Sequence, residues 1–152
     1  MNENRSDRLQ RFTMTGTPLL AEGRSSDLLA VASQLWVHAK VYAEGGERGL
    51  HSHPTEDHLF FLLAGRALFH AAGGESFEVG AYDGVMVPRG VQYSFEAIGD
   101  ENLVIVRVGA GASSERVGGK IVVKHSQGAG GVPAVKPGQG VPIPGRVFTA
   151  PR

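Results

Sequence analysis

The chain contains no cysteine, which excludes disulfide bonds, thiolate metal ligands and cysteine nucleophiles together. Long apolar runs are also absent, since a stretch such as 59–64 is far too short to cross a bilayer as a helix. The N-terminus lacks the apolar core of a secretion signal. Basic and acidic side chains number 15 each, so there is no basic excess of the kind that nucleic-acid binding requires. We therefore expect a soluble, cytoplasmic protein that binds neither nucleic acid nor membrane.

Glycine, by contrast, is abundant, and its distribution indicates an all-β fold. The 152 residues suit a single domain, and the 22 glycines fall mostly between short apolar runs, as turns do between strands. No segment has the pattern of a major helix, although residues 25–33 could form a short one. The expected strands are 35–43, 58–63, 67–71, 76–79, 85–87, 91–95, 103–108 and 120–124.

Composition also divides the chain into three parts. Residues 1–13 form a polar lead, 14–126 the folded domain, and 127–152 a tail with six glycines and five of the eight prolines. Proline removes a ladder donor and glycine raises the entropic cost of ordering. We expect the tail to be an arm or a disordered extension.

Periodicity separates two kinds of strand. In 91–95 the apolar residues Val91, Tyr93 and Phe95 alternate with polar ones, as in a strand with one face inward. The run 58–63 does not alternate, so we expect both of its faces to be covered. A second layer or a partner subunit would do this, and we favour a homodimer.

The histidines carry the clearest chemical signal. His51 and His53 are two positions apart, so in a strand their side chains point to the same side. Neutral imidazole is a good ligand for zinc, iron, nickel or copper. His58 follows five residues later, whereas His70 and His125 stand alone and are expected at the surface. The cluster predicts a metal site.

The spacing around these histidines resembles a known motif. From Gly45 the chain continues Gly45-x5-His51-x-His53-x4-His58-x6-Gly65. This is similar to the first motif of the cupin superfamily, G-x5-H-x-H-x(3,4)-E-x6-G. The resemblance extends over about residues 30–112 and implies a single cupin domain: a small double-stranded β-helix, or jelly-roll barrel, with a metal ion inside.

A second cupin motif, G-x5-P-x-G-x2-H-x3-N, has a weaker counterpart further along the chain. Tyr82 stands in place of its first glycine, and Pro88 and Gly90 form the turn. Tyr93 takes the place of the usual histidine and Ala97 that of the asparagine. The second motif therefore contributes no histidine in this chain.

The resemblance implies His51, His53, His58 and Tyr93 as the metal ligands. His58 takes the usual glutamate position, counted back from the glycine that ends the motif. A shorter spacing would instead place Asp57 there. Otherwise Asp57 and its neighbour Glu56 are expected to be solvated turn residues.

Tyr93 has three possible roles at this stage. As a phenolate it would be a fourth ligand. As a neutral phenol it would hold a metal-bound water or act as the catalytic acid. It is otherwise an ordinary barrel tyrosine with a hydrogen-bonded hydroxyl.

His38 shares a strand face with Trp36, Lys40 and Tyr42. This face could line the mouth of the cavity, but we expect it to meet solvent or a partner subunit. Arg89 is expected to be solvated rather than to bind an anionic substrate.

These ligands favour one divalent transition metal ion, zinc or iron, with manganese or nickel as alternatives. Among cupins, the resemblance implies dioxygenases, decarboxylases, isomerases and lyases, and the fold does not choose among them. Our leading hypothesis is a dioxygenase or lyase acting on a small oxygenated organic molecule. Two alternatives remain open. One is a non-catalytic sensor of a small ligand; the other is a metal-independent isomerase or epimerase with Tyr93 as acid and His51 or His58 as base.

Overall fold

The computed structural model describes residues 8–111, 114–117, 120–123 and 140–151, the side chains of 114–123 excepted. The described residues form strands and turns without a helix, and none of them makes a helix that would span a membrane. The strands are β1 (Pro18–Glu22), β2 (Arg24–Val31), β3 (Leu35–Tyr42), β4 (Gly46–His51), β5 (Glu56–Ala64), β6 (Arg66–Ala71), β7 (Ser76–Val79), β8 (Gly84–Val87), β9 (Tyr93–Ile98), β10 (Leu103–Gly111), β11 (Ser114–Val117), β12 (Lys120–Val123) and β13 (Val141–Val147).

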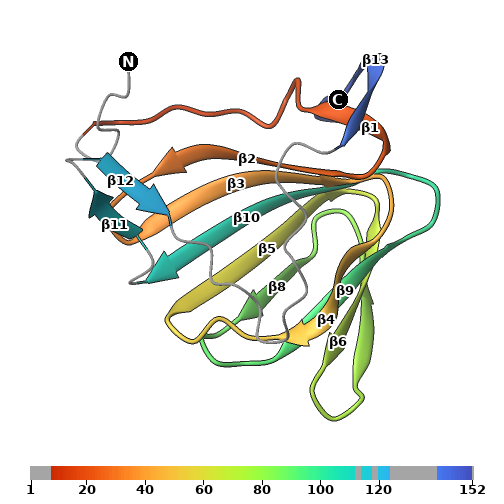
Figure 1. Ribbon diagram of the computed structural model, residues 1–152. Coiled ribbons are helices and arrows are strands. Elements are labelled where there is room, and N and C mark those ends of the chain that lie inside the picture. The colour runs from red at the N-terminus through yellow and green to blue at the C-terminus, as the bar shows by residue number, and fades with distance from the viewer. Residues whose placement is uncertain (1–7, 112–113, 118–119, 124–139, 152) are drawn as a thin grey trace.

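Two antiparallel sheets face each other and confirm the predicted jelly roll (Figure 1). One sheet has the order β2-β3-β10-β5-β8 and the other β4-β9-β6-β7; β1 pairs with β13, and β11 with β12. The position of β10 between β3 and β5 places its inward side chains in the middle of the barrel.

The interior between the two sheets is aromatic at its centre. Phe60 of β5 is fully buried and its ring lies 5.7 Å from that of Phe69 and 5.5 Å from that of Phe95, centroid to centroid. Burying one such side chain contributes about 2–3 kcal/mol. This core closes one part of the barrel, so the polar interior described below is confined to the other.

A second apolar cluster lies on the outer face of the five-stranded sheet. Met14 and Leu20 pack there with Val41 and Val104, and Phe148 covers part of the cluster. The chain's own terminal segments thus supply a second layer over part of this sheet (Figure 1).

The cover expected over both faces of 58–63 is incomplete within one chain. Leu63 packs against the second cluster, whereas Phe61, on the same outer face, is 38% exposed. The strand does alternate, with Glu56, His58, Phe60 and Leu62 inward. The outward residues Leu59, Phe61 and Leu63 are apolar as well, so the alternation does not appear in the sequence as a change between polar and apolar residues.

Three other expectations differ from the structure. Residues 25–33 are not helical but lie mostly in β2, because pairing with β3 satisfies their backbone groups. Val91 is 45% exposed in the turn before β9, so only Tyr93 and Phe95 of the predicted stripe point inward. Of the tail, 141–147 forms β13 as an arm on β1, while 127–139 lies outside the described residues.

The side chains on the His38 face of β3 also lie elsewhere than we expected. Trp36, His38, Lys40 and Tyr42 are 2%, 4%, 7% and 0% exposed, so this face lines the barrel interior instead of meeting solvent. The reason is the register: His38 pairs with Arg107 and Lys40 with Ile105 on central strand β10.

Candidate metal centre

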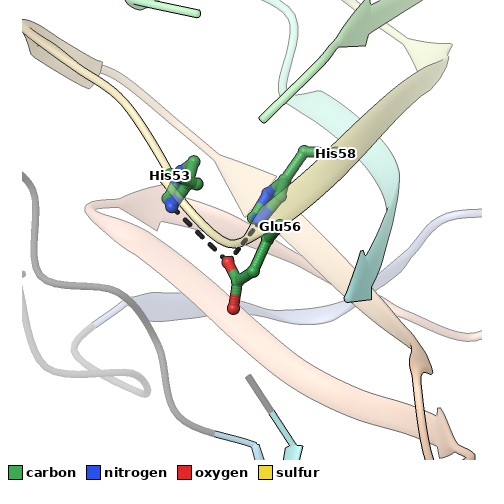
Figure 2. Close-up of side chains that lie close together, drawn as sticks. All are labelled: His53, Glu56 and His58. Atoms are coloured by element: carbon green, nitrogen blue, oxygen red, sulfur yellow. Dashed lines mark hydrogen bonds and ion pairs between the residues drawn. The ribbon is translucent and has the colours of Figure 1, made fainter. Parts of the chain in front are cut away.

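The candidate centre lies at the connection from β4 to β5. His51 is the last residue of β4, His53 follows in the loop, and a turn at Pro54 and Thr55 leads into β5. Glu56 and His58 are alternate residues of β5 and both point inward. The short turn therefore brings His53 back over the beginning of β5 (Figure 2).

Three side chains converge here: His53, Glu56 and His58. They are 6%, 2% and 2% exposed, and one ligand atom from each lies within 4.8 Å of the others. Glu56 Oε2 is 2.7 Å from His58 Nε2 and 3.6 Å from His53 Nδ1. The His53 and His58 rings stack with centroids 4.0 Å apart. Two imidazoles and a carboxylate are a donor set that suits zinc or ferrous iron.

The hydrogen bond between His53 and Tyr93 makes the other ring nitrogen of His53 an acceptor. Tyr93 donates its only proton to Glu47 Oε2 at 3.1 Å, so His53 Nε2, 3.0 Å from the Tyr93 oxygen, must be the donor to it. Burial, together with the charges of His58 and Arg107, lowers the His53 pKa to about 3, so the ring is neutral. His53 Nδ1 thus presents a lone pair towards the Glu56 carboxylate, an arrangement that a cation between them would stabilise.

His58 is held by Arg107 from the opposite side of its ring. Arg107 of β10 donates to His58 Nδ1 from Nε at 2.9 Å and from Nη2 at 2.6 Å. The His58 pKa is lowered, chiefly by burial. A neutral ring that accepts at Nδ1 carries its proton on Nε2, which donates it to Glu56.

His51, the first predicted ligand, is close to this triplet but turned away from it. Its Nδ1 donates to the Gly49 carbonyl at 2.6 Å, and its Nε2 lies 3.2 Å from Glu47 Oε2. Burial alone would lower its pKa, but the hydrogen bonds to Glu47 and Gly49 raise it. The His51 and His53 rings are perpendicular, with centroids 5.4 Å apart.

Tyr93, the fourth predicted ligand, lies between the two histidines of the motif. It is 3% exposed, and the centroid of its ring is 4.4 Å from that of His51 and 5.8 Å from that of His53. Burial and the negative charge of Glu47 raise its pKa well above the ordinary value. In this arrangement Tyr93 is a neutral phenol.

Glu47 connects these groups to the rest of the interior. Its carboxylate accepts from Lys40 Nζ at 3.1 Å as well as from Tyr93, and Arg107 Nη1 lies 3.7 Å away. Burial opposes its ionisation, but Lys40, the His51 hydrogen bond and Arg107 hold its pKa well below the ordinary value. Burial lowers the Lys40 pKa to about 8. The interior is thus a balanced network of charges.

The acidic residues of the turn separate into one buried and one exposed side chain. Glu56, which we expected to be solvated, is buried, because it has the same inward parity on β5 as His58. Asp57 points outward, with 40% of its side chain exposed. Arg89 binds Asp57 there at 2.8 Å and is itself 56% exposed, as expected for a solvated arginine.

Sequence reasoning missed Arg107 and Glu47 as parts of the site. The signal for Arg107 was available, since it is the one charged residue in the apolar run 103–108 and shares its parity with Leu103 and Ile105. Glu47 lies four residues before His51, but its inward direction depends on the pairing of β4 with β9.

Comparison with known proteins supports the same architecture. Residues 40–109 match the family model of the cupin domain. A conserved protein with a double-stranded β-helix domain from Klebsiella pneumoniae is 20% identical (TM-score 0.57; 69% of this chain and 92% of that chain covered). A putative mannose-6-phosphate isomerase from Ralstonia eutropha is 17% identical (0.57; 63% and 92%), and KdgF from Halomonas sp. 18% (0.52; 58% and 79%). No curated protein matches the chain. At these identities the likeness concerns the fold.

Proposed function

Because this chain belongs to the cupin superfamily, we propose that it is a metal-dependent enzyme that acts on a small oxygenated organic molecule inside its barrel. The observation that carries the proposal is the buried pair of His53 Nδ1 and Glu56 Oε2. A neutral nitrogen and a carboxylate oxygen face each other there at 3.6 Å, and His58 completes the set. The proposed reaction class is a dioxygenase or lyase.

Two ligand sets are compatible with this proposal, and they share His53 and His58. The geometry favours Glu56 as the third ligand, whereas the motif resemblance favours His51 and Tyr93. With His51 turned towards Glu47, we propose His53, Glu56 and His58 as the ligands, and His51 and Tyr93 as groups beside them.

A divalent ion held by His53, Glu56 and His58 would supply Lewis-acid chemistry or, in the case of ferrous iron, oxygen-dependent chemistry. The surrounding residues have separate tasks. Tyr93 holds a proton at its hydroxyl and, being neutral, is suited to donate it to a substrate oxygen. Glu47 orients that hydroxyl. Phe60 and Phe95 exclude water from the floor of the site.

The experiment is elemental analysis of protein purified without a histidine tag, followed by variants of each candidate ligand. We expect near-stoichiometric zinc or iron, with manganese or nickel as the alternatives, and its loss in His53→Ala and His58→Ala. Glu56→Gln separates the two ligand sets: it abolishes metal binding if Glu56 is a ligand, while His51→Ala then retains it. Wild-type protein that is free of metal and takes up none of these four ions would contradict the proposal.

One observation favours a second candidate, a metal-independent isomerase or epimerase. His58 already bridges Arg107 and Glu56 through both ring nitrogens, which is the arrangement of an oriented acid–base group. Full turnover of a substrate in the presence of a strong chelator would support this candidate. A sensor differs from both enzymes because it would bind its ligand without consuming it.

A further inference from the structure

The position of Arg107 bears directly on how His58 would bind a metal ion. A neutral imidazole has one lone-pair nitrogen and one N–H nitrogen. Arginine keeps its protons under all ordinary conditions, so the two donors of Arg107 at 2.9 and 2.6 Å require the lone pair to be on His58 Nδ1. His58 Nε2, which faces Glu56 and the candidate centre, then carries the proton and cannot coordinate a metal.

Arg107 is buried beside His58 and has a second acceptor nearby. It is 7% exposed, its guanidinium carbon lies 5.6 Å from the centroid of the Phe60 ring, and its backbone is in central strand β10. A second acceptor is within reach, because Glu47 Oε1 is 3.7 Å from Arg107 Nη1. The guanidinium can therefore leave His58 without losing every partner for its buried charge.

We propose that Arg107 competes with the metal ion for His58: it holds the ring in the Nε2–H form, and the ion binds only when the Arg107 donors release Nδ1. The ring then carries its proton on Nδ1, and Nε2 becomes the ligand atom. Arg107 is thus a positioning residue that weakens metal binding. This inference rests on the proposed function, since it concerns the same centre.

An ordinary supporting role for Arg107 predicts the opposite effect. Residues that hydrogen-bond a metal-ligating histidine from behind usually strengthen the site, and their loss weakens metal binding about 10–100-fold. Such partners accept a proton from the ring, whereas Arg107 donates one. The direction of the change in affinity therefore distinguishes the two roles.

The first test compares zinc affinities at pH 7, by competition with a chromophoric chelator. Arg107→Met removes the two donors to His58. We expect this variant to bind zinc at least about tenfold more tightly than the wild type, because the ion no longer competes with charge-assisted hydrogen bonds. Removing a buried positive charge also favours a cation. Lys40→Met is the matched control, because Lys40 bonds the same Glu47 oxygen at 3.1 Å.

Within the described part of the chain, the hydrogen bond of Lys40 goes to Glu47 and not to His58. The zinc affinity of Lys40→Met therefore measures the effect of removing a buried positive charge alone. We expect Lys40→Met to tighten zinc binding clearly less than Arg107→Met. Equal tightening in the two variants, or equal or weaker binding by Arg107→Met than by the wild type, would overturn the inference while leaving the proposed function standing. If neither wild type nor Arg107→Met binds zinc, both fail.

The second test needs no change at Arg107 and so does not depend on the folding of that variant. Long-range proton–nitrogen NMR spectra of ¹⁵N-histidine-labelled wild type distinguish the two ring forms, and His58→Gln assigns the signals. We expect the Nε2–H form in chelator-treated protein and the Nδ1–H form after zinc is added. An Nδ1–H form before zinc is added would overturn the inference.

Discussion

At the scale of single residues, Glu47 is the group on which the charged interior depends. Its carboxylate accepts from Lys40 and Tyr93, bonds His51 and lies beside Arg107, yet only 16% of the side chain is exposed. Buried charges are tolerated when they are paired, and removing one partner leaves the others without compensation. The stability of the site therefore depends on this one negative charge.

We expect Glu47→Gln to lower the free energy of unfolding by about 2–4 kcal/mol, since Lys40 and Arg107 would lose their buried counter-charge. Urea denaturation of the metal-free protein measures this. The matched control is Glu78→Gln: Glu78 pairs with Arg66 at the surface, where both side chains are at least half exposed. That change should alter stability by less than about 0.5 kcal/mol. Equal effects of the two substitutions would contradict the argument.

His53 makes stability depend on pH in a defined direction. Its pKa falls from 6.5 to about 3 on folding, because burial disfavours the charged ring and His58 and Arg107 add to this. Between these two pH values the unfolded chain binds a proton that the folded chain does not. The contribution of His53 is therefore complete above pH 6.5 and is lost as the pH falls.

We expect the stability difference between wild type and His53→Gln to shrink steadily as the pH is lowered from 7 to 4 in the presence of EDTA. Urea denaturation at each pH measures it. The comparison with the variant is needed because His51, whose pKa is raised, titrates with the opposite sign. A difference that is independent of pH would show that His53 is not buried in its neutral form.

At the scale of elements, β10 determines what can lie beside the centre. Its inward residues run from Leu103 and Ile105 through Arg107 to Gly109, which pairs with His58 on β5 and with Trp36 on β3. A Cβ at Gly109 would overlap the indole of Trp36, which is itself 2% exposed. Because Gly109 has no side chain, the Trp36 indole can lie directly against β10.

We expect Gly109→Ala to destabilise the protein by about 1–3 kcal/mol, because the buried indole cannot move without disturbing its neighbours. Thermal and urea unfolding measure the loss. Gly80→Ala is the control, since a Cβ there would meet its nearest neighbours only at 3.9 Å. A Gly109→Ala protein as stable as Gly80→Ala would mean that Trp36 is free to rearrange.

At the scale of the whole molecule, the outer face of the five-stranded sheet is covered at one end and open at the other. The terminal segments cover Leu63 and Val104, whereas Phe61 and Met86 are 38% and 61% exposed. Phe61 and Met86 lie on paired strands β5 and β8, and Leu59 pairs directly with Met86. Apolar side chains that adjoin in this way are typical of a contact with another chain.

We expect the protein to be a homodimer through this open part of the sheet. Analytical ultracentrifugation of the full chain measures the mass, and Phe61→Glu/Met86→Glu should shift it from dimer to monomer without loss of fold. Phe77→Glu is the control, because Phe77 is 40% exposed on the other sheet. A wild type that is monomeric at high micromolar concentration would contradict this expectation.

The sequence by itself determined the fold class and pointed to two of the residues that meet at the candidate centre. Turn glycines between short apolar runs predict a β protein, and the motif spacing from Gly45 to Gly65 predicts the jelly roll and brings His53 and His58 together. These signals are local: a side chain's direction follows from parity within one strand or one short turn.

Only the tertiary structure decided which charged groups complete the centre. Glu56 and Asp57 are neighbours in sequence with opposite surroundings, because β5 begins at Glu56, where its pairing with β10 ends, and this gives Glu56 the inward parity of His58. Arg107 reaches His58 across 49 positions of sequence. The parity of Arg107 with Leu103 and Ile105 indicates an inward side chain, but the partner that its charge meets depends on which strands lie side by side, and no local pattern contains that pairing.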